Sequence, residues 1–239
     1  MTARWRDWLD LLVAACMIAA SVTFVMTALS LRRSASNGKP GPARAPVVEV
    51  LPTAPVSLQG AALVGRKDAA FVVIEFSDFQ CPYCARFATD SWPGIRAKFI
   101  DSGRVLFAFR HLPLSAHPFA LQAARMAECG RRQNRFWELH DLFFRDGARL
   151  ATEALAETAA RVGANREQLE GCIQTEGREA VESDVAQAQA LGIRGTPTFF
   201  FGTSLKDGSV KVLRRQSGAL SPDVFSDVVA NLQRDRAAK

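Results

Sequence analysis

The chain has 239 residues, of which 48% are hydrophobic and 23% charged, a composition typical of a globular domain with an appendage. The formal net charge is +6, but the Lys and Arg residues are scattered, with pairs at Arg32-Arg33, Arg131-Arg132 and Arg214-Arg215. No long basic run interleaves with aromatic residues, which argues against a nucleic-acid groove and favours a solvated charged surface.

The N-terminal segment from Leu11 to Leu31 is strongly apolar and contains no charged residue. Its length is sufficient for a transmembrane helix and long for the core of a signal peptide. However, Ala28-Leu29-Ser30 offers a small-x-small cleavage pattern. We therefore predict an uncleaved anchor in residues 1–33, with a secreted protein after signal cleavage as the alternative.

A linker is predicted for residues 34–55. Five prolines alternate there with Ala and Gly: Pro40, Pro42, Pro46, Pro52 and Pro55. Such a segment does not build a core and tends toward extended polyproline conformation.

A pair of cysteines follows a buried strand predicted for Phe71 to Ser77. The pair is Cys81-Pro82-Tyr83-Cys84, and Pro82 suits the first position of a helix. Cys81 then lies at a helix N-terminus, where free N–H groups and the helix dipole stabilise a thiolate. Because Cys84 is one turn along, the two sulfurs can form a disulfide, and the dipeptide between them shapes its redox poise. The sequence thus predicts a dithiol/disulfide site.

Two alternatives to a redox pair fit the sequence less well. Zinc usually takes four ligands, and the other candidates form no second CxxC or HxxxH: Cys129, Cys172, His111, His117 and His140. A structural disulfide between Cys81 and Cys84 would close a very small loop and add little stability. We therefore predict a redox-active disulfide with no metal and no further cofactor.

The remaining elements complete an α/β pattern. We expect an edge strand at Val56 to Leu58, a helix from Cys81 to about Ile100 with a kink or break at Pro93-Gly94, and a strand at Val105 to Arg110. A strand–helix–strand unit implies that its two strands are parallel.

The second half begins with a mainly helical region at about 115–191. It includes a predicted helix from His117 to Cys129 and another helix with Phe136, Leu139, His140 and Phe143 on one apolar face, where His140 is expected to be a hydrogen-bonded core residue. Strands are expected at Thr198 to Phe201 and Val210 to Arg215. Ser221 and Pro222 are expected to start a final helix that ends near Arg234.

With these motifs in place, the chain resembles the DsbA-like branch of the thioredoxin superfamily over about Val56 to Leu232. The resemblance is carried by EFSDFQCPYC (Glu75 to Cys84), His117-Pro118, FWELHDLFF (Phe136 to Phe144) and GIRGTPTFFF (Gly192 to Phe201). It implies an α/β thioredoxin-like fold in residues 56–239, with an inserted helical subdomain at about 115–191 and the N-terminal transmembrane helix before it.

The resemblance also implies roles for individual residues. Cys81 corresponds to the nucleophilic, more exposed cysteine and Cys84 to its buried resolving partner. Thr196-Pro197 corresponds to the loop whose proline is cis and faces the cysteines. Glu75 corresponds to a buried acid that moves protons for Cys84, although a solvent-facing glutamate at a strand end is the alternative.

Cys129 and Cys172 both lie in the helical region. In an oxidising compartment two such cysteines often pair, and a bridge here would stabilise the fold by roughly 3–4 kcal/mol in the entropic model. We hypothesise a structural disulfide, with two buried free cysteines as the alternative.

The predicted function is an extracytoplasmic thiol-disulfide oxidoreductase that exchanges disulfides with protein thiols, most favourably forming them, and that a membrane redox partner resets. Disulfide chemistry places the domain on the periplasmic or exterior side of a bacterial inner membrane. Arg4 and Arg6 agree with this orientation, whereas the cations after the span favour the opposite one: Arg32, Arg33, Lys39 and Arg44.

Alternatives to oxidation remain open at the level of the sequence. Thr196 stands where DsbA-type oxidases commonly have Val and isomerase-like relatives have Thr, so a disulfide reductase or isomerase is the first alternative. A non-enzymatic tethered chaperone and a module that binds a thiophilic metal through Cys81 and Cys84 are the others.

Overall fold

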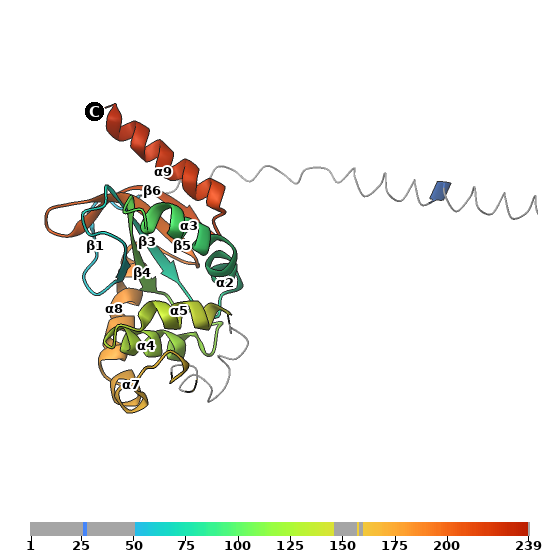
Figure 1. Ribbon diagram of the computed structural model, residues 1–239, viewed down its shortest axis with the longest axis vertical. Coiled ribbons are helices and arrows are strands. Elements are labelled where there is room, and N and C mark those ends of the chain that lie inside the picture. The colour runs from blue at the N-terminus through green and yellow to red at the C-terminus, as the bar shows by residue number, and fades with distance from the viewer. Residues whose placement is uncertain (1–25, 28–50, 146–156, 158–159, 239) are drawn as a thin grey trace, which may run out of the picture. The chain divides into compact units, whose positions relative to one another are not determined.

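The computed structural model describes residues 26–27, 51–145, 157 and 160–238, and divides the chain into two units, Met1–Val48 and Glu49–Lys239 (Figure 1). Apart from Met26 and Thr27, which are helical, the predicted span Leu11–Leu31 lies outside the described residues, as does most of the predicted linker. In the described part of the chain, no helix combines the length and apolar character needed to cross a bilayer.

A six-stranded sheet forms the centre of the described Glu49–Lys239 unit (Figure 1). Its strands lie in the order β1 (Val56–Ser57), β6 (Ser209–Ser217), β5 (Thr198–Ser204), β3 (Phe71–Ser77), β4 (Val105–His111) and β2 (Ala62–Val64). β3 and β4 pair in parallel, as the crossover predicted, and the other neighbours are antiparallel. All the predicted strands are present, whereas β2 was not predicted, because three residues are too few to show a period.

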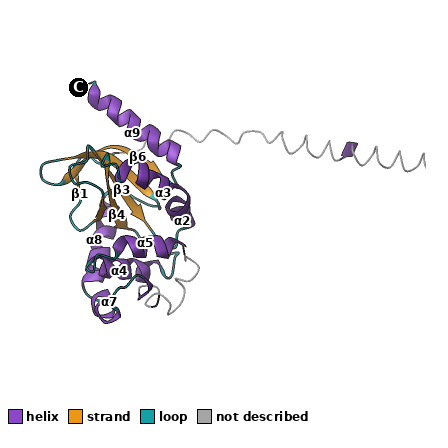
Figure 2. Cartoon of the chain, viewed as in Figure 1, coloured by secondary structure: helices purple, strands orange, loops and turns teal. Residues whose placement is uncertain are grey.

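The chain from Pro82 to Ile100 is helical, as Figure 2 shows around α2 and α3. It comprises α2 (Pro82–Arg86), a π-helical turn (Phe87–Ser91), α3 (Trp92–Ile95) and a second π-helical turn (Arg96–Ile100). Pro93 lies in the first turn of α3, where its missing N–H is tolerated. The helix is therefore irregular near Pro93-Gly94, with a π-helical turn on each side of α3, but it does not break there.

The predicted helical region contains α4 (Ala120–Arg131), α5 (Phe136–Arg145), α7 (Arg166–Ile173) and α8 (Glu176–Ala190). These helices gather on one side of the sheet in Figure 1. The prediction that a helix starts at His117 was wrong, because α4 begins only at Ala120. His117 instead lies in a turn, where its ring bonds to a carboxylate described below.

The central strand β3 is buried on both faces, so its alternating side chains build two cores. Phe71 and Val73 pack with residues of α3, β5 and α9 (Pro222–Ala237). Val72, Ile74 and Phe76 pack on the opposite face with residues of β1, β4, β6 and α8. The α9 helix begins as predicted, since Ser221 caps it and Pro222 follows.

Helix α8 is fixed to the sheet by a buried ion pair. Arg110 on β4 donates to Asp184 on α8 at 2.5 Å, and both side chains are almost fully buried. Arg110 also donates to the carbonyls of Ser57 and Gln59, and Asp184 also accepts from the His111 amide at 2.8 Å. Both charges therefore have the additional hydrogen bonds that a buried pair needs.

Cys129 on α4 and Cys172 on α7 form a disulfide, so the hypothesised bridge is present. The bridge joins positions 43 residues apart and ties two helices of the insertion together. Gly177 packs against it, since a Cβ at this position would lie 2.7 Å from the Cys129 sulfur.

Replacing both cysteines, Cys129→Ala with Cys172→Ala, should lower the free energy of unfolding by about 3–4 kcal/mol, because a loop of this size then gains entropy in the unfolded chain. Urea denaturation with the Cys81–Cys84 pair kept oxidised in both proteins measures the difference. A loss below about 1 kcal/mol would contradict a stabilising role for the bridge.

Candidate active site

Cys81 stands at the start of α2, directly after the carboxyl end of β3. It is the N-cap residue, with extended backbone (φ −70°, ψ 123°), and Pro82 occupies the first turn. The Cys81 amide donates to the Asp78 carbonyl at 3.1 Å, while the Cys81 carbonyl accepts from Ala85 at 3.0 Å. The sulfur is therefore placed among the unpaired N–H groups of a helix N-terminus, as the sequence predicted.

Hydrogen bonding at this position stabilises the Cys81 thiolate. The Cys84 side chain contributes most, followed by the side chain of Thr196 and the backbone amides of Cys84 and Tyr83, and together these lower the pKa of Cys81 to about 5 despite the opposing effect of burial. A thiol with such a pKa is ionised at neutral pH and is both a nucleophile and a good leaving group.

Cys84 has the opposite environment one turn along the helix. It is fully buried, and burial raises the pKa of Cys84 well above its ordinary value. The hydrogen bond from Cys84 to Cys81 and the charge of Glu75 raise this pKa further. The two thiols are therefore strongly asymmetric in acidity. Their exposure differs little, at 4% for Cys81 and 0% for Cys84, so electrostatics distinguishes them far more than access does.

The loop before β5 faces Cys81. The Thr196-Pro197 peptide bond is cis, and the Cys81 sulfur lies 3.3 Å from the Thr196 carbonyl oxygen, to which it donates when it is protonated. The Thr196 hydroxyl is buried and makes no other hydrogen bond in the described part of the chain, so it is free to stabilise the Cys81 thiolate and lower the pKa of Cys81. The structure thus brings Thr196 and Pro197 to the cysteines, where the resemblance placed them.

Glu75 is buried, with 1% of its surface exposed, so the solvent-facing alternative does not apply. It lies on β3 on the same face as Ser77. Burial raises the pKa of Glu75 to about 8; the nearby Ser77 hydroxyl lowers this pKa, and the Cys81 charge raises it further. Neither carboxyl oxygen has a hydrogen-bond partner among the described residues. Glu75 is therefore mostly neutral at pH 7 and coupled to both cysteines, which suits a proton donor to Cys84.

The dipeptide between the cysteines is exposed. Tyr83 shows 56% of its surface, and the Arg86 guanidinium lies 5.9 Å from the centre of its ring. Tyr83 therefore offers an aromatic surface beside Cys81 to any chain that approaches the site.

His140 is a hydrogen-bonded core residue, as the sequence predicted. Its side chain is buried with Nδ1 2.8 Å from Asp141, and burial lowers the pKa of His140.

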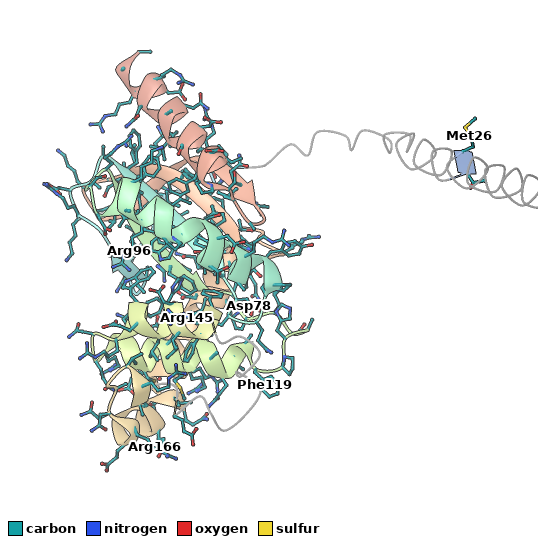
Figure 3. The ribbon with its side chains drawn as sticks, turned by 45° about the vertical axis from the view of Figure 1, so that its right-hand side comes forward. Met26, Asp78, Arg96, Phe119, Arg145 and Arg166 are labelled. Carbon is teal, nitrogen blue, oxygen red and sulfur yellow. A yellow bond between two sulfur atoms is a disulfide. The ribbon has the colours of Figure 1, made fainter. Side chains whose placement is uncertain are left out.

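Two polar residues of the site were missed from the sequence. Asp78 and Gln80 lie between β3 and Cys81, and Asp78 is 2% exposed. Figure 3 labels Asp78 where α2 approaches the helical insertion. The only sequence signal for this role was an acidic residue three positions before the first cysteine. Asp78 binds residues 114 and 117, which are too far along the chain for a local sequence pattern to link them to Asp78.

Comparisons with known proteins agree with this fold. The sequence model of the family described as thioredoxin matches residues 57–214, which is more than half of the chain. The chain belongs to the thioredoxin family. The structure of alpha-DsbA1 from Wolbachia pipientis superposes with a TM-score of 0.66 and 24% identity over 77% of this chain and 96% of that chain. For oxidised BdbD from Bacillus subtilis the values are 0.62 and 25%, over 76% of this chain and 97% of that chain.

The family model confirms the predicted membership in the thioredoxin superfamily, and the likeness to alpha-DsbA1 and BdbD confirms the predicted fold. Among curated proteins, the Na(+)/H(+) antiporter NhaA 3 of Salinispora tropica is 35% identical over 138 residues, which are 57% of this chain and 21% of that protein. The chain thus spans about a fifth of the length of the curated relatives it matches.

Burial of Glu75 predicts a specific pH dependence of stability. Because its folded pKa of about 8 lies above its ordinary value of 4.5, its contribution is fully present below pH 4.5 and is lost as pH rises through 8. In the oxidised protein, where Cys81 does not titrate, Glu75→Gln should flatten the fall in the free energy of unfolding across this window.

Urea denaturation of the oxidised wild type and variant at several pH values between 4.5 and 8 measures the slope. Glu167→Gln serves as the matched control, since Glu167 is exposed on α7 and should leave the slope unchanged. Parallel curves for wild type and Glu75→Gln would show that the Glu75 carboxyl is not held neutral by burial.

Proposed function

We propose that this protein forms disulfides in other proteins, acting outside the cytoplasm as a thiol-disulfide oxidase. The observation that carries the proposal is the contrast between the low pKa of Cys81 and the raised pKa of Cys84. A stabilised Cys81 thiolate favours the reduced form of the site, and this makes the oxidised form a stronger acceptor of electrons.

The reaction has two exchanges. First, a substrate thiolate attacks the Cys81 sulfur, and the Cys81–Cys84 bond breaks with its electron pair going to Cys84. Cys84 then takes a proton, and the neutral Glu75 carboxyl is positioned to donate it. A second substrate thiolate then attacks the substrate sulfur of the mixed disulfide, and Cys81 leaves as a thiolate. The substrate gains a disulfide and loses two electrons, which the site holds as the Cys81 thiolate and the Cys84 thiol.

The loop at Thr196-Pro197 supports the choice of a protein substrate. It forms a wall beside Cys81, where an extended chain can lie against the backbone before β5. Exposed Tyr83 stands beside the same sulfur, so the approach to Cys81 has both polar backbone and aromatic surface. The chemistry needs no cofactor besides the disulfide itself, and a redox partner that removes the two electrons must reset the site.

The proposed location is the outer face of the bacterial inner membrane, with Leu11–Leu31 as the anchor. The support is the uncharged apolar sequence of that segment together with a dithiol site whose product persists only where thiols are not kept reduced. Alkaline extraction of fractionated cells tests it: an anchored protein stays with the membrane, whereas release into the soluble periplasmic fraction would support the cleaved alternative.

Direct assay tests the direction of exchange. The oxidised protein, with oxidised glutathione as the electron acceptor, should speed the regain of activity of reduced, unfolded ribonuclease. Cys81→Ser should abolish the acceleration, and Cys84→Ser should also abolish it, because the Cys81–Cys84 disulfide that accepts the electrons cannot form without Cys84.

Wild type that reduces insulin disulfides with dithiothreitol, but does not accelerate ribonuclease oxidation, would contradict the oxidase and support a reductase. Unchanged function of Cys81→Ser in cells would instead support a tethered chaperone.

A further inference from the structure

The turn that leads into α2 is held by one buried carboxylate. Asp78 accepts from the Gln80 amide through Oδ1 at 2.7 Å, and the Asp78 carbonyl accepts from the Cys81 amide at 3.1 Å. Both N–H groups just before the helix are therefore occupied by Asp78. The amides of Tyr83 and Cys84 are the ones left to meet the Cys81 sulfur.

The other oxygen of Asp78 is bound by a different part of the chain. Oδ2 accepts from the Leu114 amide at 2.7 Å and lies 2.8 Å from Nδ1 of His117. Because a carboxylate only accepts, Nδ1 is the donor in this contact. Two of the three groups bound to this carboxylate thus come from the segment between β4 and α4, and they satisfy a charge whose side chain is fully buried.

The same segment, Leu112–Phe119, is attached at both ends. At one end the Leu112 amide donates to the Ser77 carbonyl at 2.7 Å, and at the other the Phe119 amide donates to Oε1 of Gln80 at 2.5 Å. The segment Leu112–Phe119 therefore runs alongside residues Ser77 to Gln80 and is bound to them by four hydrogen bonds. Figure 3 shows Asp78 and Phe119 on the same side of the molecule, where the helical insertion begins.

We propose that Leu112–Phe119 is a strap that positions the Asp78–Cys81 turn, with Asp78 and His117 as positioning residues for the Cys81 sulfur. The inference rests on the proposed function only in taking Cys81 as the reacting thiol. It explains why His117 does not start a helix: its ring is committed to Asp78, and α4 begins three residues later.

Loss of the His117 ring has two effects with the same sign. The turn before α2 loses one of its attachments, so the Tyr83 and Cys84 amides are held less firmly at the sulfur. In addition, the Asp78 carboxylate loses a donor, and its less compensated negative charge disfavours a second negative charge three residues away. Both effects disfavour the Cys81 thiolate.

The test is the pH dependence of Cys81 alkylation by iodoacetamide in the reduced full-length protein, followed by mass spectrometry. His117→Ala should raise the pKa of Cys81 by about one unit, a tenfold loss of thiolate at pH values below it. His117→Asn should stay close to wild type, because an Asn side-chain N–H can reach the place of Nδ1–H. Gln80→Ala, which removes the Phe119 bond without changing any charge, should give a smaller shift in the same direction.

Ser115→Ala is the matched control, since Ser115 lies on the strap but is exposed, and it should leave the pKa of Cys81 unchanged. An unchanged pKa in folded His117→Ala, whatever its melting temperature, would overturn the proposal, as would equal shifts in His117→Asn and His117→Ala. If His117→Ala does not fold, Gln80→Ala decides by the same criterion. Failure of the oxidase itself would show in the ribonuclease assay of the wild type and leave these shifts intact.

Discussion

The contact between Cys81 and the Thr196 backbone joins residues 115 positions apart, and the rest of the site depends on it. It exists because β3 and β5 are paired neighbours in the sheet, with Phe76 opposite Thr198. That register sets the loop before β5 beside the helix start that follows β3. The buried sheet therefore positions the two halves of the site, and the helical insertion follows the end of β4.

Position along one helical turn decides the chemistry of the two cysteines. The Cys84 thiol stabilises the Cys81 thiolate most, and the Thr196 side chain and the Cys84 and Tyr83 amides at the helix N-terminus add to it. Together these groups outweigh the effect of burial on the pKa of Cys81. Cys84 points into the core, where burial outweighs everything else. Glu75 adds a carboxyl that burial keeps neutral at pH 7. The CxxC spacing therefore gives one stable thiolate and one protonated thiol, and β3 supplies the proton donor.

Local patterns predicted most of the fold and the chemical pair. An apolar run interrupted only by Glu75 marks β3, Pro82 marks the start of α2, and Ser221-Pro222 marks α9. What the sequence did not show depends on contacts between distant residues: the ion pair of Arg110 with Asp184, the bonds of Asp78 to residues 114 and 117, and the short strand β2. His117 was misassigned for this reason, since a tertiary hydrogen bond overrode the local signal for a helix start.

The central claim is that stabilisation of the Cys81 thiolate makes the oxidised site a strong electron acceptor. The reduction potential of the Cys81–Cys84 pair, measured by equilibration with reduced and oxidised glutathione, tests it most directly. The account predicts a value well above about −200 mV, more oxidising than thioredoxin. A value near thioredoxin's, about −270 mV, would contradict it, because the thiolate would then contribute too little to favour the reduced form.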